Sequence, residues 1–396
     1  MARRAGDEKD GAVTAAPVER DVTLAAIADR VRTARAAREA LRIVGGGHWM
    51  HAGRPVAATS TLSVASLSGV VEYEPGDLTL TVRAATTLAE IERVTGAEGQ
   101  WLPLDPFGSA EGTIGATIST GSAGPLATAF GTPRDQMLGG VFVSGTGDVV
   151  HAGGRVVKNV AGFDLVRLVT GSWGTLGVLA EVTLRLRALP IVDRTLAIEC
   201  SADAAWRWLR SSEYSPMAAE LLSPSLASTL GVGDVTTLLL RIGGNEAYVR
   251  ATVDAAAALG PSRELDRLVW SRLAHSEPPA AAVVRLSTRP SRVAALWERT
   301  SAVLVRVGGV AHASPSRGVV RCCIPYDGSG GEEEIARLRG IVNALRIEAT
   351  LVAESLPPAL WSSVVPSAVG DPLSAGVRRA FDPDHILNPG ILGTPA

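Results

Sequence analysis

Glycine and small hydroxyl residues recur in bursts between Gly108 and Leu186, and each burst lies beside an apolar run. The stretch begins GSAEGTIGATISTGSAGPLATAFGTPRDQMLGG and ends GGRVVKNVAGFDLVRLVTGSWGTLGVLAEVTLRL. Because glycine has no Cβ, it lets backbone approach backbone, or a ligand, where any other residue would clash. Long helices and buried strands do not need this composition, whereas a large, flat, phosphorylated ligand lying against the main chain does. We therefore expect the rest of the chain to be organised around this stretch.

The length and composition indicate a folded protein with two or more domains. The chain has 396 residues, of which 46% are hydrophobic and 20% are charged, as in ordinary globular proteins. Its net charge of −2 gives no reason to expect nucleic acid or an anionic membrane as a partner. The three cysteines do not make a disulfide framework. The N-terminal residues lack the apolar core of a secretory signal, and no stretch approaches the ~20 apolar residues of a membrane helix. We expect a cytoplasmic protein with no transmembrane segment.

The pattern along the chain predicts an α+β protein in four segments. Residues 1–17 resemble a disordered tail. Residues 18–190 begin with a helix over 22–41, continue with a short strand and a Gly-Gly-Gly-His turn, and contain two hairpins, at 70–85 and 138–150. Residues 191–355 carry roughly two rounds of strand-helix-strand-strand-helix, the split pattern of a ferredoxin-like antiparallel sheet. Residues 356–396 form a proline-containing C-terminal segment.

Three groups of residues are candidates for ligand binding, and each has a simpler explanation. The turn from Gly45 to His48 exposes backbone N–H groups that suit a pyrophosphate, but a plain tight turn explains it equally. The small residues from Thr113 to Gly124 could line a ligand, with Arg134 supplying a charge and Asp135 orienting it. The simpler explanation is that the small residues allow close strand packing and that Arg134 and Asp135 form a surface ion pair. The turn at residues 171–177 precedes a buried strand.

Standard catalytic motifs are missing from the sequence. It contains no G-x-G-x-x-G that follows a strand and opens a helix, no P-loop, no H-E-x-x-H, no C-x-x-C and no G-x-S-x-G. This disfavours a Rossmann site, phosphoryl transfer, zinc or dithiol chemistry and a serine-nucleophile elbow. We expect no metal site.

The order of the motifs carries a family resemblance over nearly the whole chain. The runs RIVGGGHW, LPLDPFGSAEGTIGATIST, GTPRDQMLG, KNVAGFD…GSWGTLGVLAEV and FDPDHILNPG together resemble FAD-binding oxidoreductases of the vanillyl-alcohol-oxidase type, with a PCMH-type FAD domain. Within that group they are most similar to the E subunits of bacterial glycolate oxidases. The resemblance implies that residues 18–190 and the C-terminal segment bind FAD, and that residues 191–355 form a ferredoxin-like cap.

The resemblance also assigns cofactor contacts. It implies that the glycine turn holds the pyrophosphate, that the segment around residues 104–124 lines the ribityl chain and flavin, that the G-[ST]-x-R-D element lies beside the cofactor, that residues 171–178 meet the adenine end, and that a tail residue returns to the flavin. The residues at these places are Gly45, Gly46, Gly47, His48, Leu104, Asp105, Thr113, Gly115, Gly121, Gly124, Arg134, Asp135, Gly171, Thr175, Gly177, Val178 and Asn388.

Four further residues have open roles. His48 occupies the place where some relatives attach FAD covalently, although contact with phosphate accounts for it too. Relatives that oxidise 2-hydroxy acids have a histidine-rich, metal-binding element late in the cap, where this chain has His312 alone, which a structural role also explains. Lys158 either faces the flavin or is an exposed lysine, and Asp164 either belongs to the site or caps a helix.

The resemblance implies an FAD-dependent oxidoreductase acting on a small 2-hydroxy acid such as glycolate or D-lactate, with hydride transfer to flavin N5. A base would take the hydroxyl proton and an arginine would hold the carboxylate, but the sequence names neither residue. The alternative is a catalytically silent FAD-holding subunit of a glycolate oxidase-type complex, together with a homologous flavin subunit and an iron–sulfur subunit. A third hypothesis, an NADPH-dependent enolpyruvyl reductase, is disfavoured by the FDP…ILNPG tail.

Overall fold

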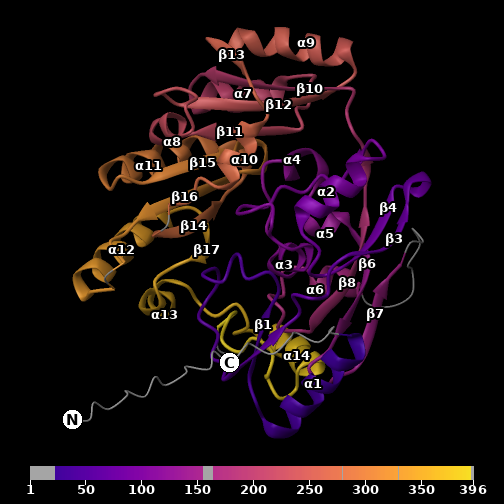
Figure 1. Ribbon diagram of the computed structural model, residues 1–396. Coiled ribbons are helices and arrows are strands. Elements are labelled where there is room, and N and C mark those ends of the chain that lie inside the picture. The colour runs from indigo at the N-terminus through magenta and orange to yellow at the C-terminus, as the bar shows by residue number, and fades with distance from the viewer. Residues whose placement is uncertain (1–22, 155–163, 279, 329, 394–396) are drawn as a thin grey trace, which may run out of the picture.

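Two large antiparallel sheets, each with its own helices, dominate the computed structural model, which describes residues 23–154, 164–278, 280–328 and 330–393. Figure 1 shows the eight-stranded sheet at the upper left and the five-stranded sheet at the right. The tail expected at residues 1–17, and Lys158, lie outside the described residues. The mixture of helices and antiparallel sheets confirms the predicted α+β class.

The first helix ends earlier than the sequence pattern predicts. Helix α1 spans Leu24–Ala37 and begins at Thr23, whose side chain accepts the Ala26 N–H. It was expected to reach residue 41, but Arg38 adopts a left-handed conformation with φ of 52°, which ends the helix. Strand β1 (Leu41–Val44) follows at once and pairs in parallel with β2 (Ser60–Ser63).

The five-stranded sheet contains both predicted hairpins. Its order is β3 (Val70–Glu74), β4 (Thr79–Arg83), β8 (Val178–Arg185), β6 (Met137–Val143) and β7 (Val149–Gly153). Strand β8 lies at the centre and alternates between buried and partly exposed residues, as predicted. The same part of the chain contains α2 (Leu88–Gly96), α3 (Ile114–Thr120), α4 (Ala127–Phe130), α5 (Pro133–Gln136), α6 (Leu165–Val169) and the strand pair β5 (Gln100–Trp101) with β9 (Arg187–Ala188).

The eight-stranded sheet consists of two ferredoxin-like halves joined edge to edge. The first half has the strand order β13-β10-β12-β11 and the second β15-β16-β14-β17, and the halves meet where β11 pairs antiparallel with β15. The first half contains β10 (Val192–Glu199), α7 (Ala202–Ser211), β11 (Ala218–Leu222), α8 (Pro224–Thr229), β12 (Thr237–Gly244), α9 (Glu246–Ala256), β13 (Ser262–Leu265) and α10 (Leu268–Ala274). The second contains β14 (Ala281–Ser287), α11 (Val293–Arg306), β15 (Val310–Ser314), β16 (Val319–Pro325), α12 (Glu332–Leu345) and β17 (Thr350–Ser355). The sequence pattern predicted most of these elements but not β13, α8 or α10.

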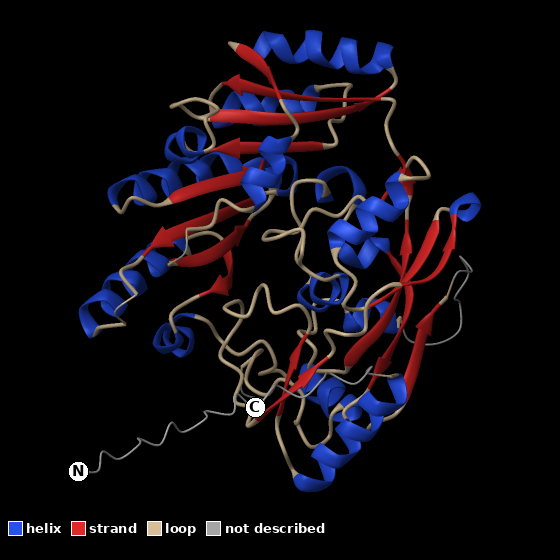
Figure 2. Cartoon of the chain, in the orientation of Figure 1, coloured by secondary structure: helices blue, strands red, loops and turns tan. Residues whose placement is uncertain are grey.

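The two faces of this sheet meet different neighbours. One face packs against α7, α9, α11 and α12 in the largest apolar core. The other face packs against α8 and α10, and also against Leu126 from the five-stranded part of the molecule. Figure 2 shows the loops that gather between the two large sheets. Side chains on this second face therefore point towards the part of the chain that carries the glycine-rich stretch.

The C-terminal segment returns to the first strand. After α13 (Trp361–Val364) and α14 (Pro372–Phe381), the buried Asp382 carboxylate accepts the N–H groups of Ile386 and Leu387 at 3.1 and 2.9 Å. The Leu41 N–H then donates to the Ile386 carbonyl at 2.7 Å. The last described residues thus pack beside β1, about 345 positions away in sequence.

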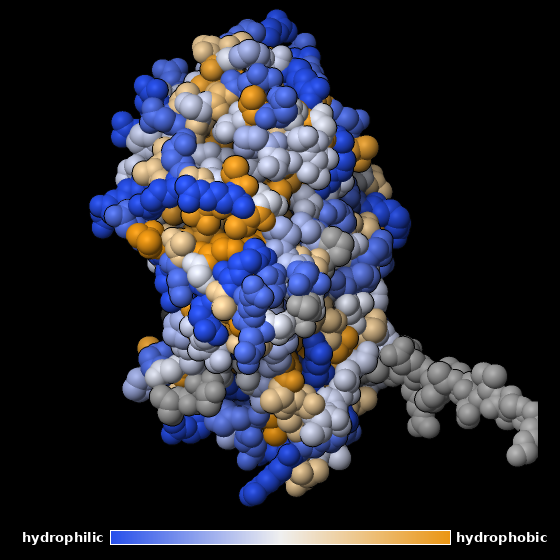
Figure 3. Space-filling model, turned by 90° about the vertical axis from the view of Figure 1, so that its left-hand side faces the viewer, coloured by the Kyte–Doolittle hydropathy of each residue, from blue (hydrophilic) through white to orange (hydrophobic). Residues whose placement is uncertain are grey.

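The exterior is mostly hydrophilic on the face drawn in Figure 3, which also shows an apolar patch at mid-height. Exposed apolar side chains of the second ferredoxin-like half include Val305, which is 66% exposed, and Ile347, which is 61% exposed. Within the described residues, none of the helices combines the length and the apolar character needed to cross a bilayer.

Candidate functional site

A hollow of about 980 Å³, including space open to solvent, lies where β1, the start of α3, residues 173–179 and the C-terminal segment meet. These four pieces are far apart in sequence and come together because the tail pairs with β1 and the end of α3 contacts the turn before β8. The predicted cofactor residues that line this hollow are Gly45, Gly46, Gly47, His48, Thr113, Gly115, Gly177 and Asn388. We call it the cofactor hollow below.

The glycine turn forms one end of the cofactor hollow. Gly47 has φ of 76°, which side chains rarely tolerate, and a Cβ added to Gly46 would lie 2.8 Å from Nδ1 of His48. Gly46, Gly47 and His48 are exposed, so the turn presents its backbone to the solvent. Arg42 also lines the hollow and donates to the Met50 carbonyl at 2.8 Å. Backbone N–H groups and a guanidinium are the groups that hold a pyrophosphate.

The wall beside this turn is aromatic and contains an unpaired donor. The rings of Trp49 and Trp173 stack with centroids 6.1 Å apart, and both residues line the cofactor hollow. The indole Nε1 of Trp49 is buried and has no hydrogen-bond partner among the described residues. An unpaired buried donor is costly, so this group is satisfied best by a ligand acceptor. A phosphate-binding turn, flat aromatic walls and a free donor fit FAD, which combines a pyrophosphate with two flat ring systems.

Asn388 connects two walls of the cofactor hollow. Its Oδ1 accepts the Ile43 N–H and its Nδ2 donates to the Trp173 carbonyl, both at 2.8 Å. Asn388 is 6% exposed and has φ of 42°, a left-handed conformation that asparagine tolerates better than most residues. One amide side chain therefore holds β1 and the turn before β8 at a fixed separation.

Several predicted residues lie behind the wall of the cofactor hollow. The Gly171 N–H donates to the Ile118 carbonyl at 3.0 Å, and Gly121 contacts Gly171, so this pair holds the end of α3 in place. Leu104, Thr175 and Val178 pack into the surrounding core, and the Thr175 hydroxyl donates to the Ser172 carbonyl at 2.7 Å. None of these residues is among those lining the hollow in the described structure, and their direct contact with FAD stays a prediction.

Two acidic residues that the sequence singled out cap helices. The Asp135 carboxylate accepts the Thr132 N–H at 2.7 Å, and this hydrogen bond lowers the pKa of Asp135. Arg134 is exposed on the same short helix, and neither it nor Asp135 lines the cofactor hollow. Asp164 caps α6 by accepting the Arg167 N–H at 3.0 Å, as the simpler interpretation expected.

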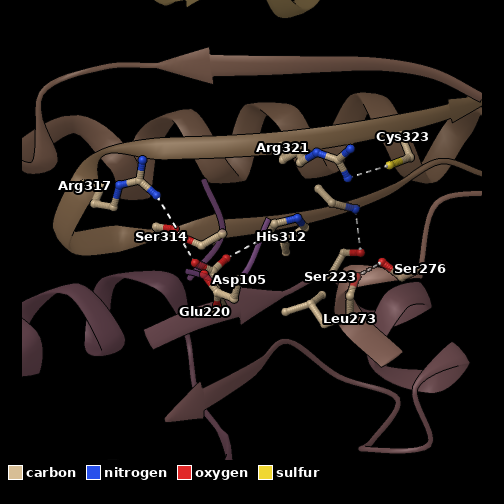
Figure 4. Close-up of polar contacts among 12 residues, drawn as sticks. Asp105, Glu220, Ser223, Leu273, Ser276, His312, Ser314, Arg317, Arg321 and Cys323 are labelled. Carbon is tan, nitrogen blue, oxygen red and sulfur yellow. Dashed lines mark hydrogen bonds and ion pairs between the residues drawn. The ribbon is translucent and has the colours of Figure 1, made fainter. Parts of the chain in front are cut away.

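A second, smaller hollow of about 270 Å³ lies between the glycine-rich segment and the eight-stranded sheet. We call it the interface hollow. Phe107, Ala123 and Gly124 form one side, and the other side consists of cap residues Arg285, His312, Ser314, Arg317, Val319 and Arg321. Figure 4 shows several of these cap residues with Asp105 and Glu220 around the same space. Gly124 therefore belongs to this hollow and not to the wall of the cofactor hollow.

Asp105 is packed directly against Gly124. A Cβ on Gly124 would come within 1.9 Å of the Asp105 carbonyl oxygen, so no other residue fits there. The Asp105 carboxylate accepts the Leu126 N–H at 3.1 and 3.0 Å. Its burial raises the pKa of Asp105 to about 7, against the opposing effects of the Leu126 N–H, Arg241 and Arg317.

The raised pKa of Asp105 makes stability depend on pH. The folded protein holds this proton up to about pH 7, whereas the unfolded chain releases it near the ordinary value of 3.8. Wild-type stability therefore falls as pH rises between these values and stays lowered above them. Asp105→Asn keeps an acceptor for Leu126 without a charge, so its stability relative to wild type should rise by on the order of 3 kcal/mol between about pH 5 and pH 9.

Urea unfolding curves across this pH range measure the effect. The matched control is Asp77→Asn on an exposed turn, which removes a carboxylate without touching the interface hollow. A constant stability difference between Asp105→Asn and wild type would show that Asp105 ionises as an ordinary carboxylate.

A buried ion-pair network forms the cap side of the interface hollow. Arg321 is 2% exposed, and its guanidinium pairs with Glu354 at 2.8 Å and with Glu277 at 3.2 Å. Its guanidinium carbon also lies 4.2 Å from the centre of the Phe107 ring. Burial alone lowers the pKa of Arg321, but the carboxylates outweigh burial and the net pKa is raised. Arg321 is therefore held in place as a cation.

Arg317 and His312 carry the free polar groups of the interface hollow. Nη1 of Arg317 donates to the Gly124 carbonyl at 3.2 Å, and Arg317 forms no ion pair with a carboxylate of the described residues. Nδ1 of His312 lies 2.7 Å from Oε2 of Glu220, and the Ser314 hydroxyl donates to the other oxygen of Glu220. Nε2 of His312 is buried and has no partner among the described residues. The hollow thus offers one cation and one imidazole nitrogen to a ligand.

Apart from His312, the sequence motifs do not single out the charged residues of the cap, although a signal for them exists. Glu220, Arg285, Arg321 and Glu354 are single charged residues inside otherwise apolar strands. Their apolar neighbours at odd spacing pack in the core on the helix-covered face, so the charged residues face the opposite side. A charged residue on an expected buried strand is costly unless it is paired. Four of them on neighbouring strands indicate a polar site on that face.

Comparison with known families supports the cofactor assignment. A family described as "FAD binding domain" matches residues 22–153. The glycolate oxidase subunit GlcE of Escherichia coli is 35% identical over 256 residues, which cover 64% of this chain and 69% of that protein. The mitochondrial D-lactate dehydrogenase [cytochrome] of Arabidopsis thaliana is 27% identical over 362 residues, covering 81% of this chain and 63% of that protein.

Solved structures show the same fold. A 4-ethylphenol oxidase from Gulosibacter chungangensis superposes with a TM-score of 0.71 at 16% identity, covering 94% of this chain and 88% of that one. An alkyldihydroxyacetonephosphate synthase superposes with a TM-score of 0.68 at 15% identity, covering 92% of this chain and 75% of that one. The cofactor hollow, the family match and these relatives agree, and the chain belongs to the FAD-binding oxidoreductases of the vanillyl-alcohol-oxidase fold, in the family that includes the glycolate oxidase subunit GlcE.

Proposed function

We propose that this FAD-dependent oxidoreductase oxidises a small 2-hydroxy acid, such as glycolate or D-lactate, as part of a glycolate oxidase-type complex. The observation that carries the proposal is the position of the interface hollow, next to the segment that also forms the cofactor hollow. Ser119 and Thr120 line the cofactor hollow, and Ala123 and Gly124 line the interface hollow. Three residues of chain span at most ~11 Å, so the two hollows are neighbours along this segment.

The charges of the interface hollow favour a carboxylate ligand. Arg317 has its guanidinium at the hollow without a carboxylate partner among the described residues, and Arg285 reaches Glu354 only at 4.0 Å. Guanidinium groups bind carboxylates through two parallel hydrogen bonds. Arg317, with Arg285, is therefore the arginine that holds the carboxylate of the acid.

His312 is the group placed to take the hydroxyl proton. Its Nε2 is unpaired and its Nδ1 is held by Glu220, the arrangement of a histidine that acts as a general base. When bound, FAD supplies the acceptor for the hydride that leaves the α-carbon. Phe107 and Val319 are apolar walls that keep water from the reacting group.

The alternative is an FAD-holding subunit without catalysis of its own. Two observations favour it: the Escherichia coli relative is named as a subunit, and Arg321 already forms ion pairs with Glu354 and Glu277. Assembly with other subunits, expected to be a homologous flavin subunit and an iron–sulfur subunit, agrees with the apolar patch in Figure 3.

Anaerobic mixing of the FAD-loaded protein with glycolate or D-lactate tests the proposal. We expect the visible flavin absorption to bleach, and we expect Arg317→Met to raise the half-saturating concentration of the acid by about 10- to 100-fold, because a charged hydrogen bond contributes about 1.5–3 kcal/mol. The FAD content of both proteins is the control. Full FAD content without bleaching would support the silent subunit. Acid precipitation of the same sample shows whether colour stays with the protein, as a covalent link at His48 requires.

A further inference from the structure

We infer that Glu220 is a positioning residue that fixes which nitrogen of His312 carries the proton, so that the unprotonated Nε2 faces the interface hollow. The inference rests on the proposed function for its catalytic meaning, but its geometry is independent of the substrate. Glu220 comes from β11 in the first ferredoxin-like half, and His312 comes from β15 in the second. The residue pair therefore spans the line along which the two halves join.

Both oxygens of the Glu220 carboxylate are engaged. Glu220 is 0% exposed, Oε2 lies 2.7 Å from Nδ1 of His312, and Oε1 accepts the Ser314 hydroxyl. A carboxylate in this state only accepts hydrogen bonds. In a neutral imidazole, Nδ1 of His312 must then be the nitrogen that carries hydrogen, and Nε2 keeps its lone pair. The Glu220 carboxylate thus selects one of the two tautomers of neutral imidazole.

The unpaired nitrogen belongs to a residue that lines the interface hollow. His312 is 4% exposed and lines the interface hollow, and Nε2 has no partner among the described residues. The Phe107 ring lies 5.1 Å from the His312 ring and packs against it. An acceptor that is buried without a donor is costly in a purely structural histidine. The hydroxyl group of a 2-hydroxy acid would supply that donor.

Charged groups from six parts of the chain surround this pair. Asp105, from the segment just before the glycine-rich stretch, and Arg317, from the turn between β15 and β16, interact with Glu220 and with each other. Arg321 on β16 is the cross-strand neighbour of His312, and its own charge is balanced by Glu277 and by Glu354 of β17. Arg285 on β14 lines the same hollow. The carboxylate of Glu220 is thus balanced by Arg317, and His312 interacts electrostatically with Glu354 as well.

Glu220→Gln tests the inference because it changes the charge and not the shape. The amide of the new residue can donate to Nδ1 of His312, which moves the imidazole hydrogen to Nε2 and removes the lone pair from the hollow. We expect the rate of flavin bleaching by saturating glycolate to fall by about 10- to 100-fold, with little change in half-saturating concentration or FAD content. Glu264→Gln, on the exposed edge strand β13 of the same sheet, is the matched control, because it removes a glutamate charge away from the interface hollow.

Nitrogen-15 NMR of the histidine rings gives a readout that needs no substrate. The signals of His312 are those that disappear in His312→Gln. In the wild type, Nδ1 should be the protonated nitrogen and Nε2 the unprotonated one, and in Glu220→Gln this order should reverse. An unchanged tautomer with an unchanged rate would overturn the inference. If the wild type binds FAD but no acid bleaches it, the proposed function fails, whereas the NMR result still decides the role of Glu220.

Discussion

Replacing Arg321 with methionine should destabilise the protein by on the order of 3–5 kcal/mol, because the substitution removes the nearest counter-ion of the buried Glu354 and of the partly buried Glu277. Arg321 is 2% exposed and pairs with Glu354 at 2.8 Å and Glu277 at 3.2 Å. Methionine retains the unbranched, apolar part of the side chain and its contact with the Phe107 ring. The expected loss therefore reports mainly on the charge.

The pH dependence of this loss follows from Glu354. Burial alone raises the pKa of Glu354, but Arg321 and Arg285 lower it by more, so the net pKa lies below the ordinary value of 4.5. The stabilisation that the pair contributes is present above that value and disappears as pH falls through the folded pKa. The stability difference between wild type and Arg321→Met should be largest near neutral pH and should shrink in acid.

Urea unfolding at several pH values measures the effect, and two further variants sharpen it. Arg321→Met combined with Glu354→Gln should recover part of the loss, because one of the unpaired charges is gone. Arg299→Met removes an exposed arginine that pairs with Glu348 at 2.6 Å and should cost no more than about 1 kcal/mol. Equal losses for Arg321→Met and Arg299→Met would show that the network around Arg321 contributes no more than a surface pair.

Replacing Asn388 with alanine should weaken FAD binding by about 100-fold. The substitution leaves the Ile43 N–H and the Trp173 carbonyl without the two hydrogen bonds of 2.8 Å that Asn388 makes. Without these hydrogen bonds the two walls can separate in the apoprotein and bind water, so FAD binding has to bring them together again. Two hydrogen bonds contribute up to about 3 kcal/mol, and 1.4 kcal/mol corresponds to a tenfold change in affinity. Asn388→Asp should be at least as severe, because a carboxylate accepts from Ile43 but faces the Trp173 carbonyl without a hydrogen to donate.

Titration of the apoprotein with FAD, followed by flavin fluorescence, measures the affinity. Asn343→Ala, on the exposed side of α12, is the control for loss of an amide elsewhere. Affinities within threefold of wild type for both Asn388 variants would mean that the tail is not needed to shape the cofactor hollow.

The sequence predicted the cofactor hollow better than the interface hollow, and the reason is physical. Gly45 to His48, Thr113 and Asn388 lie in motifs whose backbone conformation depends on residue type, so the residue types reveal them. Leu104, Thr175 and Val178 lie in the same motifs but pack in the core. A motif alone does not show which of its residues line the hollow and which pack behind the lining residues.

The interface hollow depends on which strands pair with each other, and a single sequence does not show that pairing. Glu220 and His312 are 92 positions apart and meet because β11 and β15 are the strands through which the two ferredoxin-like halves join. The histidine looked structural by itself, since nothing near it in sequence is acidic. The alternation of charged and apolar residues in these strands shows which side chains share one face of the sheet, provided that the order of strand pairing is known.

The return of Asn388 to β1 also fixes an order of events during biosynthesis. The residues that line the cofactor hollow run from Arg42 to Ile391. The whole eight-stranded sheet lies between them in sequence and is translated before the last of them. The glycine turn is therefore joined to its partner in the tail only after some 340 further residues have been synthesised. The cofactor hollow is complete only once this late segment has been made.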